Sequence, residues 1–391
     1  MMDTSRRNLL KAAAVLAVDR WSRLYGLDAG ARSRGASSDD ERKIIVVSCA
    51  GVRRSDTFHD SGLENIPHLF HDLLPSSVFY PYLLNSGVTS HYNTISSIVT
   101  GNWQRLDDWG KTPPESPTIF EYLRKRRGIP QDKTWLISSN KALTSRIGAS
   151  SVSDFGPAYG ANVVFPKQLL INAVVHAASG GHADHSASRN TMQPEIEAIL
   201  RSQDYEGLDW SVFGNDLALD GRMLASVQDA IADLVRTTAA VTGDEFTYLV
   251  SLEVMKRFAP SLLVITFSDV EVAHFGSYSM YLSGIRTMDR LVYELWSFVQ
   301  ATPAYKDKTT LFILPEFGRD LDGSNTNGFF NHRLNDDATR MAWLMCVGEA
   351  AGSPQIVERP IEHVDLCPTI AKLFDIGKLE LAGNGLPEIS A

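Results

Sequence analysis

Two apolar runs, each rich in β-branched and aromatic residues, most constrain the fold of this 391-residue chain. They cover residues 261–267 (SLLVITF) and 309–315 (TTLFILP), and both end abruptly in polar and charged residues. Such runs are typical of strands that are buried on both faces of a parallel sheet and that deliver side chains into a crevice at their carboxyl ends. The sequence therefore predicts an α/β protein with a functional site at these strand ends.

Acidic residues and histidines follow both runs. Asp269, Glu271 and His274 come after the first run, Glu316 comes directly after the second, and His332 lies further along. Carboxylates and imidazoles gathered in one crevice would suit a divalent metal ion or acid–base chemistry. The alternative is that each residue is a helix cap, a turn former or a solvated loop residue. The repetition at two strand ends favours a site.

Alternation of strands and helices extends through most of the chain. Strands are predicted at 43–48, 78–84, 135–139, 262–267 and 309–315, with helical segments around 66–74, at 94–99 and from 116. Residues from about 145 to 260 interrupt this pattern and read as an inserted, mainly helical subdomain. We therefore expect one α/β domain over 43–391, a three-layer sandwich with a mostly parallel central sheet.

Composition limits the function classes. Hydrophobic residues make up 44% of the chain and charged residues 21%, which is ordinary for a globular protein with a sizeable core. The net charge of −9 argues against nucleic-acid binding, because neutralising phosphates requires clustered lysine and arginine. The three cysteines (Cys49, Cys346 and Cys367) have no metal-type spacing and are expected to be buried and unpaired.

The N-terminus resembles an export signal. Residues 5–11 (SRRNLLK) precede a short apolar segment at 12–18, as in twin-arginine signals, and residues 32–42 read as a polar linker. The segment 1–42 therefore predicts a bacterial protein exported to the periplasm or cell envelope through the twin-arginine pathway. Asp19 and Arg20 shorten the apolar segment, so an amphipathic N-terminal helix that stays attached is the alternative. No integral membrane span is predicted beyond such an uncleaved signal.

The order of elements over residues 43–389, apart from the insertion, resembles the alkaline phosphatase superfamily, which includes sulfatases, nucleotide pyrophosphatases and phosphonate hydrolases. The resemblance implies two divalent metal ions on Asp and His ligands, which activate a Thr, Ser or modified Cys for attack on phosphorus or sulfur. The resemblance rests on six segments. Residues 44–53 are similar to the family's first strand and its metal-binding turn, 97–101 to the end of the nucleophile helix, and 269–276 to the second metal segment. Residues 310–318 are similar to the strand ending in Asp-His-Gly, 331–333 to the late metal histidine, and 363–387 to the C-terminal helix and closing turn.

Departures from the family pattern fall on one of the two implied metal sites. Ala50 stands where the first turn should hold an Asp, His91 stands at the nucleophile position, and Glu316-Phe317-Gly318 replaces Asp-His-Gly. The resemblance therefore predicts that this site is lost. The other site keeps His274 and His332, with Asp269 or Glu271 as its acid and Glu316 within reach, and one Zn²⁺, Mn²⁺ or Ca²⁺ ion is expected there. The usual spacing of four residues from acid to histidine fits neither Asp269 nor Glu271.

Three further residues are candidates for catalysis. His91 is either a phosphoryl-accepting or acid–base imidazole, or a histidine held by loop hydrogen bonds. Thr94 is either a nucleophile at a helix N-terminus or simply an early helical residue, with Asn93 as the cap. Arg53, after the first strand, would clamp an anionic group.

Two functions of different classes remain. The favoured one is a non-catalytic binding or assembly protein, a pseudoenzyme with protein partners and one divalent metal. The alternative is a metal-dependent hydrolase with a remodelled site that acts on a small anionic phosphate or sulfate ester. Arg319 and Asp320 are a candidate structural ion pair.

Overall fold

A computed structural model describes residues 42–167, 242–324, 328–334 and 336–390. The predicted export signal and the middle of the expected insertion lie outside these residues. Within the described ranges, no helix is both long enough and apolar enough to cross a membrane.

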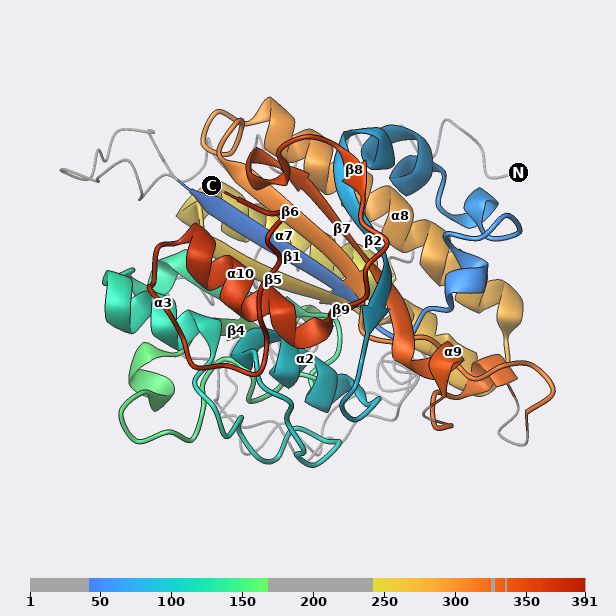
Figure 1. Cartoon of the computed structure of the whole chain (residues 1–391), viewed down its shortest axis with the longest axis horizontal. Coiled ribbons are helices and arrows are strands. Elements are labelled where there is room, and N and C mark those ends of the chain that lie inside the picture. The colour runs from blue at the N-terminus through green and yellow to red at the C-terminus, as the bar shows by residue number, and fades with distance from the viewer. Residues whose placement is uncertain (1–41, 168–241, 325–327, 335, 391) are drawn as a thin grey trace, which may run out of the picture. The chain divides into compact units, whose positions relative to one another are not determined.

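The described residues form a nine-stranded mixed sheet in the order β4-β3-β5-β1-β6-β7-β2-β8, with β9 beside β2 (Figure 1). Strand β7 runs antiparallel to both of its neighbours, β6 and β2, and the other pairings are parallel. The expected mostly parallel α/β sheet is thus confirmed. The strands are β1 Lys43–Cys49, β2 Ser77–Leu84, β3 Thr134–Ser138, β4 Asn162–Val164, β5 Leu262–Phe267, β6 Thr309–Pro315, β7 Met341–Gly348, β8 Gln355–Ile356 and β9 Ile361–Glu362.

Helices cover both faces of this sheet, which gives the expected three layers (Figure 1). Helices α2, α3 and α10 lie over one face, and α7 and α8 lie over the other. Their bounds are α2 His91–Thr100, α3 Ile119–Arg127, α7 Gly243–Phe258, α8 Tyr278–Ala301 and α10 Leu366–Leu373, with a short α9 at Asp337–Arg340. Short 3₁₀ or π helices η3 Leu63–Asn65, η4 Leu69–Leu73 and η5 Leu74–Ser76 stand in place of the helix predicted around 66–74. The 3₁₀ helices η10 Asp269–Phe275 and η11 Gly328–Phe330 lie near the candidate site.

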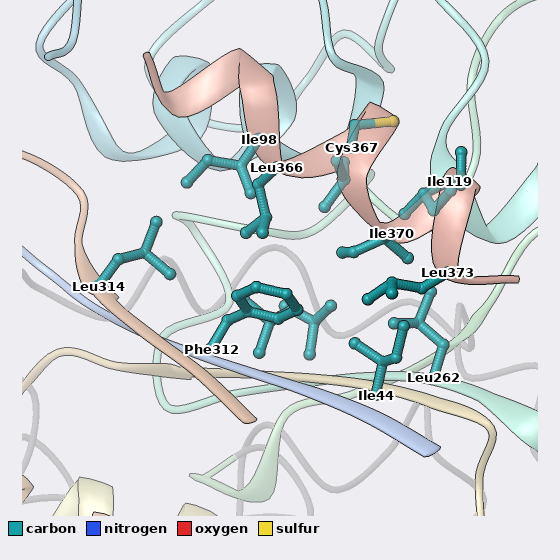
Figure 2. Packing of buried hydrophobic residues seen from close by; sticks show 14 of the residues in the cluster. Ile44, Ile98, Ile119, Leu262, Phe312, Leu314, Leu366, Cys367, Ile370 and Leu373 are labelled. Atoms are coloured by element: carbon teal, nitrogen blue, oxygen red, sulfur yellow. The ribbon is translucent and has the colours of Figure 1, made fainter. Parts of the chain in front are cut away.

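The hydrophobic core is built from side chains that alternate between the two faces of the central strands. Strands β1, β5 and β6 are buried along their whole length. Alternate residues such as Ile44, Leu262 and Phe312 point toward α10, where Ile370 and Leu373 meet them (Figure 2). Continuous burial on both faces explains why these strands read as apolar runs rather than as alternating ones.

Helix α2 begins at His91, three residues earlier than the sequence pattern predicted. Ser90 is its N-cap residue, in an extended conformation, and its carbonyl accepts the first helical hydrogen bond from the backbone N–H of Thr94. The helix ends at Gly101, whose φ of 69° is a left-handed conformation that suits glycine. The early start places His91 in the first helical turn instead of the preceding loop.

Both ends of the expected insertion at about 145–260 are described. Strand β4 extends the sheet beyond β3, and α7 packs against α8, β3 and β5. These two segments are therefore parts of the sandwich itself.

Candidate metal centre

The candidate site lies at the carboxyl edge of three adjacent strands. Strand β5 leads into η10, which carries Glu271 and His274, and β6 leads directly into Glu316. Strand β1 lies between them and ends beside Ala50. The first turn of α2 contributes His91, and the loop after η11 contributes His332. Parallel strand order thus gathers residues from four distant parts of the chain.

Glu271 is the centre of this group. Its Oε2 lies 3.0 Å from Nε2 of His91 and 2.9 Å from Nε2 of His274. The turn η10 is a 3₁₀ helix, in which residues three apart lie on the same side, so Glu271 and His274 face the same way. Nδ1 of His91 lies 2.7 Å from Oε2 of Glu316. Both glutamates are only 2% exposed.

The second oxygen of Glu271 binds Arg319, whose side chain is wholly buried. Arg319 also donates from Nε to the carbonyl of Gly51 at 2.6 Å and from Nη2 to the carbonyl of Val270 at 3.4 Å. Glu271 and these two backbone carbonyls thus hold the Arg319 guanidinium. Asp320 instead accepts hydrogen bonds from the backbone N–H of Leu334 and the hydroxyl of Thr339.

His332 provides the clearest indication that this group suits a metal ion. Its Nδ1 lies 2.9 Å from the carbonyl of Thr89, so Nδ1 carries the proton and Nε2 carries a lone pair. Nε2 is buried and has no hydrogen-bond partner within the part of the chain that the structure describes. One ligand atom from each of His91, Glu271, His274 and His332 lies within 4.8 Å of the others. Three imidazoles and one carboxylate are a donor set that zinc and manganese accept, so these residues fit a divalent ion.

Burial and neighbouring charges set the protonation of the group. Burial opposes the charged form of His91, but the carboxylates of Glu271 and Glu316 outweigh it and raise its pKa well above the usual value. Burial would raise the pKa of Glu271, but Arg319 and His91 lower it well below its usual range. Burial, followed by the charge of His91, lowers the pKa of His332. His332 is therefore neutral, with its lone pair available.

One wall of the site is apolar. Phe317 is wholly buried, and its ring centroid lies 4.5 Å from that of His332 and 4.9 Å from that of His91. Ala50 is also wholly buried. A phenyl ring and a methyl group offer no electron pair to a metal ion, so neither residue adds a ligand.

The remaining sequence candidates lie outside the four-residue group. The Asp269 carboxylate accepts a hydrogen bond from the backbone N–H of Asp244 at the start of α7. The guanidinium of Arg53 already pairs with Asp56 and Asp322, at 3.2 and 3.1 Å.

Thr94, the candidate nucleophile, is buried in a hydrogen-bonded position. Its hydroxyl accepts from Nδ2 of Asn85 at 2.8 Å and donates to the carbonyl of Val88 at 3.3 Å. It is an early residue of α2, although the cap is Ser90 and not Asn93.

Solved structures with the same architecture extend these observations. The chain is similar to the phosphonate monoester hydrolase SpPMH from Silicibacter pomeroyi, with 15% identity and a TM-score of 0.53 over 88% of this chain and 76% of that one. It is similar to a protein in the alkaline phosphatase superfamily from Vibrio parahaemolyticus, with 12% identity and a TM-score of 0.51 over 96% and 76% of the two chains. The alkaline phosphatase PafA aligns with 12% identity and a TM-score of 0.53, over 89% of this chain and 99% of PafA.

This chain has the alkaline phosphatase superfamily fold. The family resemblance predicted from the sequence is thus confirmed at the level of the fold. No protein-family profile matches the sequence, and no curated protein sequence matches it. In the alkaline phosphatase fold of this chain, the His/Glu group lies where the fold brings three strand ends together.

Proposed function

We propose that this protein is an exported metal-binding protein that keeps the alkaline phosphatase fold without hydrolysing phosphate or sulfate esters. The observation that carries the proposal is the buried Nε2 of His332, which has no hydrogen-bond partner among the described residues. One ligand atom of His332 lies within 4.8 Å of a ligand atom of each of His91, Glu271 and His274. An unpaired buried nitrogen is costly in free energy, and a metal ion would relieve that cost.

A single ion is the occupancy that the residues support. Ala50 and Phe317 provide no donor atom, and the buried guanidinium of Arg319 already places a positive charge beside Glu271. Three imidazoles favour zinc, followed by manganese, over calcium, which prefers oxygen ligands. A bound ion would supply Lewis acidity toward an anionic ligand, and its four protein ligands would hold α2, η10 and the loop after η11 together.

The side chains of the four-residue group support a non-catalytic role. The four-residue group contains no hydroxyl or thiol. Both nitrogens of His91 face carboxylates, at 3.0 Å for Glu271 and 2.7 Å for Glu316, so neither is directed at a substrate. In this role the protein would act on a protein partner, as a binding or assembly factor.

A second candidate function is a metal-dependent hydrolase of small phosphate or sulfate esters. The names of SpPMH, a phosphonate monoester hydrolase, and of the alkaline phosphatase PafA favour phosphorus esters. His91 would be the nucleophile or acid–base group in that case, because it stands at the N-terminus of α2, where a developing negative charge is stabilised. The two candidates differ in turnover, whereas both require the metal.

Metal analysis combined with an ester panel tests the proposal. We expect one zinc or manganese ion per purified chain, and no turnover of an aryl phosphate, a phosphodiester or an aryl sulfate above the buffer rate. His332→Ala should lose the ion, while His59→Ala, which changes an exposed histidine, should retain it. A metal-free wild-type protein would refute the metal site, and metal-dependent turnover would favour the hydrolase.

Export is tested separately. The proposal expects the chain in the periplasmic or envelope fraction of a bacterial host, and expects Arg6→Lys with Arg7→Lys to retain it in the cytoplasm. Equal distribution of the wild type and this variant between the cell fractions would refute export through the twin-arginine pathway, without affecting the metal-site proposal.

A further inference from the structure

We propose that Arg319 is a positioning residue that takes the place of a second cation beside Glu271 and restricts the site to one metal ion. This inference rests on the proposed function, because it concerns the geometry of the same metal group. It assigns a role to a residue that the family pattern does not specify.

The environment of Arg319 resembles that of a bound cation. The side chain is wholly buried, and oxygen atoms surround its guanidinium: the carbonyls of Gly51, Val270 and Phe329, and Oε1 of Glu271. These partners come from the turn after β1, from η10 and from η11. A guanidinium keeps its charge when buried and presents its donors in a fixed planar arrangement. Arg319 therefore fixes three segments around one permanent positive charge.

The contact with Glu271 determines what that carboxylate offers to a metal ion. Oε1 is bound by Arg319, and Oε2 faces Nε2 of His91 and Nε2 of His274. With Oε1 occupied, only Oε2 remains for an ion. Arg319 thus selects a single-oxygen ligand and holds it toward the imidazoles.

The location of the guanidinium explains the limit of one ion. Arg319 binds the carbonyl of Gly51, the residue after Ala50, and this turn is where the family resemblance expects an acidic ligand for another ion. Ala50 offers no ligand, and a dication in the same place would be repelled by the buried guanidinium. The lack of a metal-binding side chain at Ala50 and the buried positive charge of Arg319 are therefore consistent with each other.

Zinc titrations of the whole protein test this role. The variants are Arg319→Met, which removes the charge, and Arg319→Lys, which keeps the charge but cannot contact Gly51 and Glu271 with the same planar geometry. Arg290→Met, on α8, is the matched control, because Arg290 is partly exposed and pairs with Glu245 and Glu294. Thermal unfolding with a chelator present measures stability without metal.

We expect Arg319→Met to weaken zinc binding by about 10- to 100-fold, Arg319→Lys by a smaller factor, and Arg290→Met to leave it unchanged. If Arg319→Met does not fold, a zinc affinity of Arg319→Lys equal to that of the wild type overturns the inference, and a weaker one supports it. Wild-type affinity in a folded Arg319→Met protein, or tighter binding, also overturns it. A wild-type protein that binds no zinc refutes the proposed function itself, which is a distinct result.

Discussion

The carboxylate of Glu316 lies 2.7 Å from Nδ1 of His91, and both side chains are buried. Glu316 thus acts on the side of the imidazole that faces away from Glu271. A carboxylate at Nδ1 keeps the proton on that nitrogen, so Nε2 is the nitrogen that would lose its proton and ligate a metal ion. We therefore place Glu316 as a partner of His91 and not as a metal ligand.

Glu316→Gln should weaken zinc binding by about tenfold, because a neutral amide supports the His91 ligand less strongly than a carboxylate does. The measurement is a zinc competition titration against a chelator. Glu358→Gln, which changes an exposed glutamate, is the control and should bind like the wild type. An unchanged affinity for Glu316→Gln would show that Glu316 does not support His91.

Asp244 and Asp269 bind each other reciprocally. The carboxylate of Asp269 accepts from the backbone N–H of Asp244 at 3.1 Å, and the carboxylate of Asp244 accepts from the N–H groups of Asp269 and Ser268 at 3.0 and 2.8 Å. The start of α7 is thereby tied to the start of η10, which carries Glu271. Asp269 therefore has a structural role at the start of η10 and is not a member of the four-residue metal group.

Asp244→Ala should lower the free energy of unfolding by about 1–3 kcal/mol, because the partly buried backbone N–H groups of Ser268 and Asp269 lose their acceptor. Urea unfolding of the chelator-treated protein measures this loss. Asp60→Ala provides the control, since Asp60 is exposed. Equal stability of the two variants would mean that the reciprocal contact contributes nothing measurable.

The central strands and their polar ends could be predicted from the sequence, because β1, β5 and β6 are buried along their whole length and read as apolar runs. The choice between Asp269 and Glu271 could not. It depends on the 3₁₀ geometry of η10, where a spacing of three residues aligns Glu271 with His274. A spacing rule taken from other proteins gives no information about this turn.

The pairing of Arg319 with Glu271 also could not be predicted from the sequence. Its neighbour in the chain, Asp320, is an obvious candidate partner, but Arg319 reaches Glu271, which is 48 residues away. Only the adjacency of β5, β1 and β6 brings these two side chains together. Long-range ion pairs of this kind have no local signature, because they depend on strand order.

Adding the missing ligands alone should not create a second metal site. We expect Ala50→Asp with Phe317→His to bind one ion, because the guanidinium of Arg319 remains beside the turn after β1. Adding Arg319→Ser to this double variant should raise the number of metal ions bound per chain toward two. Metal content by elemental analysis decides this, with thermal unfolding as the check on folding. Two ions in the protein that retains Arg319 would contradict the proposed place of its guanidinium.

Zinc affinity should increase with pH, and binding should release a proton near neutral pH. Burial opposes protonation of His91, but Glu271 and Glu316 raise its pKa, so the metal-free protein holds a proton on both ring nitrogens. This proton stabilises the folded, metal-free protein fully when the pH is below 6.5, the ordinary pKa of histidine. The stabilisation is lost as the pH rises through the raised pKa that His91 has in the folded protein. Zinc must displace the proton from Nε2, so acid favours the metal-free form. His332, whose pKa is lowered by burial, has no proton to release from Nε2.

Calorimetric titrations in buffers of different ionisation enthalpy count the protons that zinc binding releases, and titrations across the pH range measure the zinc affinity. Zinc binding without proton release and with constant affinity would show that His91 is not a ligand.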